Sequence, residues 1–181
     1  MRVRSFSARL DANSFLITPY RVDRHTVDID DLVLVRQNAA ETGKMPSRAN
    51  RLHAAIYRRH PTVHAIVNAF TVNATAFSVT RTALDSRTIP ESYIFLRRVG
   101  RIRYGPQFAN PDAVAAVVSP EKPICLLEND GVLVCGTNVL DAFDRLEVLE
   151  STAEAVINAG HLGKIAPMNS KAIKDLERAF F

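Results

Sequence analysis

The chain has 181 residues, of which 47% are hydrophobic and 23% are charged, and this suffices for one globular domain with a sizeable buried core. The net charge of +4 and the pI of about 9.3 admit anionic ligands, but without a long basic run or an aromatic RNA-binding motif we do not expect nucleic-acid binding. No apolar run reaches the ~18 residues of a membrane-spanning helix, and the first residues lack an apolar signal-peptide core, so we expect a cytoplasmic protein with no membrane partner.

The first third of the chain predicts strands followed by one helix. Runs of β-branched and aromatic residues bounded by Pro, Asp and Asn are typical of strands. A loop then leads to Ser47, which we predict to be the N-cap of a helix that Pro61 terminates. The expected elements are strands at residues 3–10, 15–18 and 32–35 and a helix at residues 49–60.

The rest of the chain alternates short strands with helices. The clearest helical pattern covers residues 139–159, where apolar residues recur at spacings of three and four. Because strands alternate with helices and several links are short, we expect an α/β domain with a central, largely antiparallel sheet flanked by helices. The sequence predicts strands at 65–67, 101–104, 124–127 and 132–134, helices at 73–79, 112–119, 139–159 and 170–180, a helix or irregular segment at 90–97, and a loop at 106–111.

The segment Asn129-Asp130-Gly131 separates two apolar runs and predicts a tight hairpin turn, since all three residue types tolerate positive φ. Cys125 and Cys135 flank this hairpin, and we expect buried reduced thiols, although a disulfide between them is an open alternative. Glu128 and Asp130 either form the polar part of the turn or a weak site for a divalent cation.

The histidines give little support for a metal site. A lone histidine on the first helix, His53, is expected to be packed rather than to bind a ligand. His60 and His64 have the spacing of a helical metal pair, but Pro61 lies between them and breaks the helix that such a pair needs.

Several segments, in their order and spacing, resemble the class II aldolase/adducin family from residue 6 to about residue 181. This resemblance implies the family's α/β fold, and the hairpin at residues 129–136 matches the one that carries a zinc-binding histidine in the family. The other matching segments are residues 7–11 with 15–19, residues 30–35, residues 46–47 with 52–57, and residues 74–79.

The resemblance also implies a catalytic site with a zinc ion on three histidines and a glutamate as the acid/base. The aligned positions in this chain are Asn68, Phe70 and Asp130 for the histidines and Ala49 for the glutamate. Phe70 has no ligating atom and Ala49 cannot transfer a proton. We therefore expect neither zinc nor another cofactor and assign no catalytic or metal-binding residue, and the four positions mark only a candidate pocket.

The family's phosphate-binding positions differ as well. Small residues that approach a phosphate in the family correspond here to Arg4-Ser5, Arg21 and Ser47-Arg48. Arg4, Arg21, Ser47 and Arg48 either form a new anion site with multi-donor guanidinium groups or close an unused pocket.

These substitutions lead to three functional hypotheses. The first is a catalytically inactive homologue with a structural, regulatory or partner-binding role, as in the adducin branch. The alternative is an aldehyde-lyase-like enzyme with a rebuilt site for a phosphorylated or acidic small molecule, so whether the chain is an enzyme stays open. The third is a hetero-oligomer with an active paralogue. The resemblance implies a homo-oligomer, by analogy a tetramer, of one domain at residues 1–181. The helix that precedes the family's first strand is not found in the sequence, so either that helix is missing or the start has been trimmed.

Overall fold

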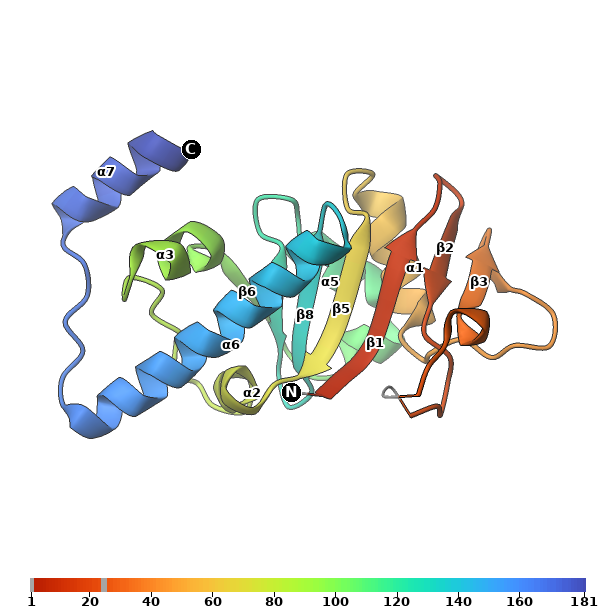
Figure 1. Cartoon of the computed structure of the whole chain (residues 1–181), viewed down its shortest axis with the longest axis horizontal. Helices are drawn as coiled ribbons and strands as arrows, with labels where there is room; N and C mark the ends of the chain where they lie inside the picture. The colour runs from red at the N-terminus through yellow and green to blue at the C-terminus, as the bar shows by residue number, and fades with distance from the viewer. Residues whose placement is uncertain (1, 24–25) are drawn as a thin grey trace.

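The computed structural model describes residues 2–23 and 26–181. Within these residues, eight strands form one sheet in the order β4-β3-β2-β1-β5-β8-β7-β6. All neighbouring strands are antiparallel except β6 and β7, which are parallel. Helices cover both faces of the sheet (Figure 1), so the predicted largely antiparallel α/β domain is confirmed.

The elements follow the predicted order. The strands are β1 (Arg2–Arg9), β2 (Ser14–Ile17), β3 (Val33–Arg36), β4 (Ala39–Ala40), β5 (Ala65–Phe70), β6 (Val99–Ile102), β7 (Ile124–Leu127) and β8 (Gly131–Gly136). The helices are η1 (Ile29–Asp31, a 3-10 helix), α1 (Asn50–Arg59), α2 (Val72–Ser78), α3 (Pro90–Leu96), α4 (Pro106–Ala109), α5 (Pro111–Val117), α6 (Val139–Leu162) and α7 (Ser170–Phe180).

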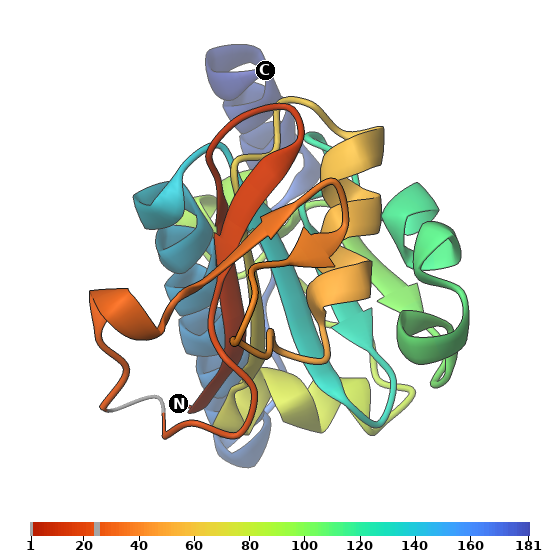
Figure 2. The same cartoon turned by 90° about the vertical axis from the view of Figure 1, so that its right-hand side faces the viewer.

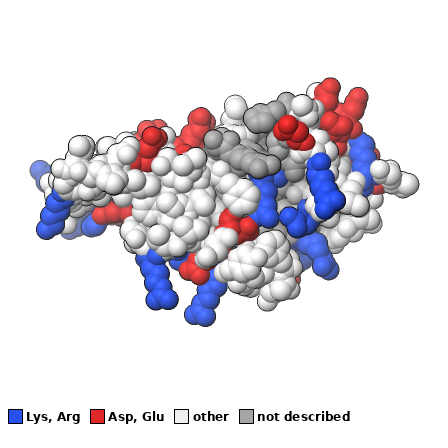
Figure 3. Space-filling model, turned by 90° about the horizontal axis from the view of Figure 1, so that it is seen from below, with Lys and Arg blue, Asp and Glu red and all other residues white. Residues whose placement is uncertain are grey.

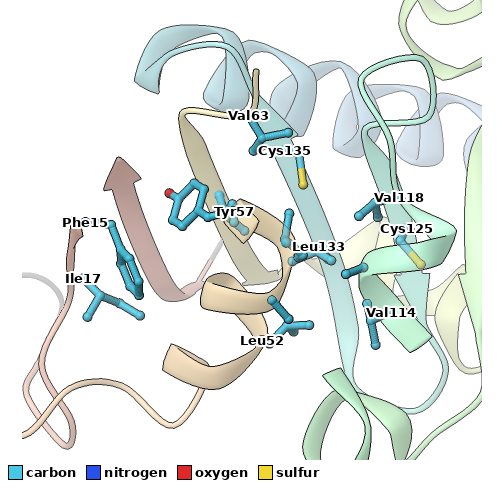
Figure 4. Packing of buried hydrophobic residues seen from close by; sticks show 14 of the residues in the cluster. Phe15, Ile17, Leu52, Tyr57, Val63, Val114, Val118, Cys125, Leu133 and Cys135 are labelled. Carbon is cyan, nitrogen blue, oxygen red and sulfur yellow. The ribbon is translucent and has the colours of Figure 1, made fainter. Parts of the chain in front are cut away.

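Two hydrophobic clusters fix the helices to the sheet. Helices α1 and α5 lie on one face and α6 lies on the other (Figure 2). The cluster under α1 and α5 includes Ile56, Val114 and Leu133 and also contains both cysteine side chains (Figure 4). The second cluster joins α2, α3 and α6 to the opposite face through residues such as Phe77 and Leu146. Both thiols are free and buried, and burial raises the pKa of each to about 12.

Two local predictions are wrong. Ser47 is not the N-cap of α1: Ala49 occupies that position without a side-chain cap, while the carbonyl of Ser47 accepts from the backbone N of Asn50 at 2.9 Å. Ser47 therefore belongs to a turn before the helix. Residues 106–111 are not a loop, because Pro106 and Pro111 each begin a short helix, as proline favours at the first helical position.

The chain ends in a helix with little packing. No residue of α7 is buried, and it projects from the body beside α3 (Figure 1). The hydroxyl of Tyr93 donates to Glu177 at 2.8 Å, and the guanidinium of Arg97 lies 3.2 Å from the ring centroid of Phe181. No helix in the described part of the chain has the length and apolarity to cross a membrane.

Candidate functional site

The predicted hairpin turn between β7 and β8 brings Asp130 next to the end of β5. Asn129 has a φ of 56° and Gly131 a φ of 131°, both in the region that Asn and Gly tolerate. A Cβ at residue 131 would lie 2.5 Å from the carbonyl oxygen of Ala69 and 3.0 Å from the ring of Phe70. Gly131 thus permits the close approach of the hairpin turn to Ala69 and Phe70.

Arg4 reaches this site because β1 carries a bulge. Val3 pairs with Ala69 and Ser5 pairs with Asn68, so Arg4 is the extra residue on β1 between two consecutive residues of β5. A bulge redirects the side chain it carries. The guanidinium of Arg4 forms an ion pair with Asp130 Oδ1 and lies 4.8 Å from the ring centroid of Phe70. The Asp130 side chain is only 10% exposed.

The second oxygen of Asp130 is also engaged. Gln107 Nε2 in α4 donates to Asp130 Oδ2 at 3.2 Å, and Gln107 Oε1 accepts from the backbone N of Gly105 at 2.8 Å. Gln107 was not expected here, since its segment was predicted to be a loop. The Gly105-Pro106 pair was the only local signal, because proline favours the first position of a helix.

Behind this surface lies a buried chain of polar side chains that joins β1, α1 and β5. His53 Nε2 lies 2.7 Å from Asn68 Oδ1, which can only accept, so this ring nitrogen carries the proton. His53 Nδ1 therefore accepts from Ser7 Oγ at 2.6 Å, and Ser7 Oγ accepts from the Tyr57 hydroxyl at 2.8 Å. The expectation that His53 is a packed residue is confirmed.

Burial determines the ionisation states of the side chains in this hydrogen-bonded network. His53 is fully buried, and desolvation lowers its pKa from 6.5 to about 4, although the hydrogen bond to Asn68 opposes the shift. Burial also raises the pKa of Tyr57. The ring of His53 is therefore neutral near pH 7 and fixes the orientation of the Asn68 amide. Asn68 itself is buried.

The N-terminus of α1 holds the remaining expected positions. Ala49 begins the helix next to buried Ser47, whose hydroxyl lies 3.4 Å from the backbone N of Ala49. The guanidinium groups of Arg21 and Arg48 lie 5.2 and 5.8 Å from the ring centroid of Tyr20, so one aromatic ring brings these two cations together. Arg4 contacts Asp130 and Phe70 instead, and an anion pocket formed by all three arginines stays a prediction. Figure 3 shows Lys and Arg side chains gathered on the right of the lower face.

These residues do not fit a zinc ion. The amide oxygen of Asn68 accepts from His53, Phe70 offers no ligating atom, and both oxygens of Asp130 have protein donors. Zinc prefers cysteine, histidine and carboxylate ligands, usually four in tetrahedral geometry. In the described residues no group of three or more His, Cys, Asp or Glu side chains is arranged to hold a metal.

The other carboxylate and histidine candidates have structural partners. Glu128 Oε1 lies 3.8 Å from Arg101 Nη1, so Glu128 and Asp130 face different arginines. His60 Nε2 donates to the carbonyl of Ala115 at 2.8 Å and so links α1 to α5.

Comparisons with known proteins agree on the family. The family model described as the class II aldolase and adducin N-terminal domain matches residues 5–157. A 3-oxo-tetronate 4-phosphate decarboxylase of Haemophilus influenzae is 30% identical over 96% of this chain and 85% of its own length. An L-fuculose phosphate aldolase of Methanococcus vannielii is 34% identical over 62% of this chain and 60% of its own length. The structure of Escherichia coli YgbL has a TM-score of 0.82 at 27% identity, covering 97% of this chain and 86% of YgbL. The chain therefore belongs to the class II aldolase and adducin family.

Proposed function

We propose that this chain is a catalytically inactive member of its family that acts as a structural, regulatory or partner-binding subunit. The observation that carries the proposal is the engagement of Asp130, whose two carboxylate oxygens accept from Arg4 and Gln107. A ligand or metal ion at this carboxylate would have to compete with both donors.

The other family positions support the same proposal. Asn68 is bound to His53, Phe70 packs under the Arg4 guanidinium, and Ala49 has no proton to transfer. Relatives carry the names of enzymes that act on sugar phosphates and related phosphates, so the proposal separates this chain from those named activities.

The test combines metal analysis with activity assays. The purified protein is analysed for zinc by mass spectrometry and assayed with 3-oxo-tetronate 4-phosphate, L-fuculose 1-phosphate and methylthioribulose 1-phosphate, the substrates that relatives' names indicate. We expect substoichiometric zinc and no turnover, while a three-histidine relative purified in parallel is active. Stoichiometric zinc together with cleavage of any of these substrates would refute the proposal.

We further propose that the chain assembles as a homo-oligomer, by analogy a tetramer. Apolar side chains are exposed on α2 and α4: Val72 is 75% and Phe108 is 48% exposed, and exposed apolar surface favours association. Light scattering coupled to gel filtration measures the mass. A hetero-oligomer with an active paralogue is the other arrangement, and co-purification from the native host distinguishes the two.

A second candidate function is an enzyme with a rebuilt site for a phosphorylated or acidic small molecule. It is favoured by the placement of Arg21 and Arg48 around Tyr20, beside buried Ser47. Thermal-shift screening with phosphates and carboxylates tests it, because a bound ligand raises the melting temperature. If no ligand raises the melting temperature in a way that depends on Arg21 or Arg48, this candidate is removed.

Compartment and domain extent belong to the same proposal. We propose the cytoplasm, because Cys125 and Cys135 are both free thiols, as is usual in a reducing compartment. We also propose that residues 1–181 act as one domain. Cell fractionation and limited proteolysis check these two points.

A further inference from the structure

We infer that the guanidinium of Arg4 supplies the positive charge that the family's metal ion would supply. It contacts Asp130 and Phe70, two of the positions that the resemblance aligns with the metal ligands. The inference rests on the proposed function and adds to it the group that replaces the metal. Two of the three positions aligned with zinc ligands, Phe70 and Asp130, contact this one side chain.

The backbone is arranged to deliver Arg4 to this face. Ser5 and Ser7 point toward His53 in α1, whereas Phe6 points to the opposite face and stacks on Phe143 of α6 at 5.7 Å. Regular alternation would direct Arg4 to the face of Phe6. The bulge between Val3 and Ser5 breaks this alternation and brings Arg4 to the face of Phe70 and Asp130.

The position of Asp130 requires a cation. Its side chain is 10% exposed, and a carboxylate that is largely withdrawn from water is costly without a counter-charge. The amide of Gln107 donates a hydrogen bond at 3.2 Å but carries no charge. Among the residues that the structure describes, Arg4 is the cation paired with this carboxylate.

A guanidinium fits this place better than an ammonium would. Its Cζ atom lies over the Phe70 ring, 4.8 Å from the centroid, while Nη1 donates to Asp130. Arginine combines stacking and directed donation in this way, whereas lysine acts as a compact point charge. The charge of the site is therefore compensated within the chain, independent of the metal supply.

The test asks whether removal of Arg4 creates a need for an external cation. Arg4→Ala is compared with wild type, with Arg4→Ala/Asp130→Asn, and with Arg58→Ala, which opens the exposed pair between Arg58 and Asp112. The probes are guanidinium chloride and MnCl2 at low millimolar concentration, each against NaCl of equal ionic strength. Melting temperature is the readout, and wild-type metal content and activity are measured separately.

The single variant is expected to melt lower than wild type and to regain about 3 °C or more with guanidinium or Mn²⁺. Wild type, the double variant and Arg58→Ala are expected to show no such gain. No gain in Arg4→Ala, or an equal gain in the double variant, overturns the inference. If Arg4→Ala does not fold alone, the readout becomes the fraction of folded protein that guanidinium or Mn²⁺ recovers, and the same criteria apply. Arg4→Lys keeps the positive charge and should fold without either added cation. If wild type holds zinc and is active, the proposed function fails whatever these variants do.

Discussion

Arg4 and Asp130 are 126 positions apart in sequence, yet they form an ion pair across the end of β5. The pair depends on a bulge at one residue and on a tight turn at the other. It is mostly shielded from solvent on the acid side, where the Asp130 side chain is 10% exposed, and less so on the arginine side, where the Arg4 side chain is 31% exposed. Such a pair contributes more than a surface salt bridge, because solvent screens it less.

Replacement of Asp130 by alanine is expected to destabilise the fold by about 1.5–3 kcal/mol, the usual range for a lost hydrogen bond to a charged group. The matched control is Asp112→Ala, which removes the acid of the exposed pair with Arg58 and should cost less than about 1 kcal/mol. Urea unfolding gives both free energies. Equal losses in the two variants would show that the Arg4–Asp130 pair has no special weight.

The buried histidine predicts a specific dependence of stability on pH. The pKa of His53 is about 4 in the folded protein against 6.5 when unfolded. Below pH 6.5 the unfolded chain therefore binds the proton more readily, and stability falls as the pH decreases toward 4. The loss from this residue approaches about 3 kcal/mol and then levels off at lower pH.

Unfolding free energies measured from pH 7.5 to pH 4 in wild type and in His53→Gln check this prediction. The variant lacks the titrating ring, so its stability should fall less over this interval, even if it starts lower. Parallel curves for the two proteins would contradict the assignment of the pH dependence to His53.

In the buried polar network behind the site, Ser7 lies between Tyr57 and His53, so we expect Ser7 to contribute more to stability than Tyr57 at the end. Tyr57→Phe removes one hydroxyl donor and is expected to cost about 1 kcal/mol. Ser7→Ala leaves both the Tyr57 hydroxyl and His53 Nδ1 without their partner, and two buried unsatisfied groups should cost about 2–4 kcal/mol. Denaturant unfolding gives the stability of each variant. A larger loss of stability for Tyr57→Phe than for Ser7→Ala would show that the hydrogen bonds do not run in the order described.

The sequence predicted the scaffold of the site better than its contacts. The turn at Asn129-Asp130-Gly131 and the apolar periodicity of α6 depend on local patterns, and both are present. The position of Arg4 depends on a bulge, and alternation along β1 would have sent the side chain to the other face. Gln107 was missed for a different reason, because the short helix α4 has no periodicity to detect.

The packing of α6 on the sheet gives the last prediction. Gly136 ends β8 beneath α6, and a Cβ there would lie 2.5 Å from the backbone N of Ala142 and 2.9 Å from its Cβ. These neighbours are backbone and a short side chain, which cannot swing away, so Gly136→Ala must push α6 from the sheet and is expected to cost about 1–3 kcal/mol. A Cβ added at Gly160, within α6 itself, would have no neighbour within 4 Å. Gly160→Ala should therefore stabilise the fold by up to about 1 kcal/mol through helix propensity. Thermal and urea unfolding of the two variants should therefore move in opposite directions, and a neutral Gly136→Ala would mean that α6 is free to shift on the sheet.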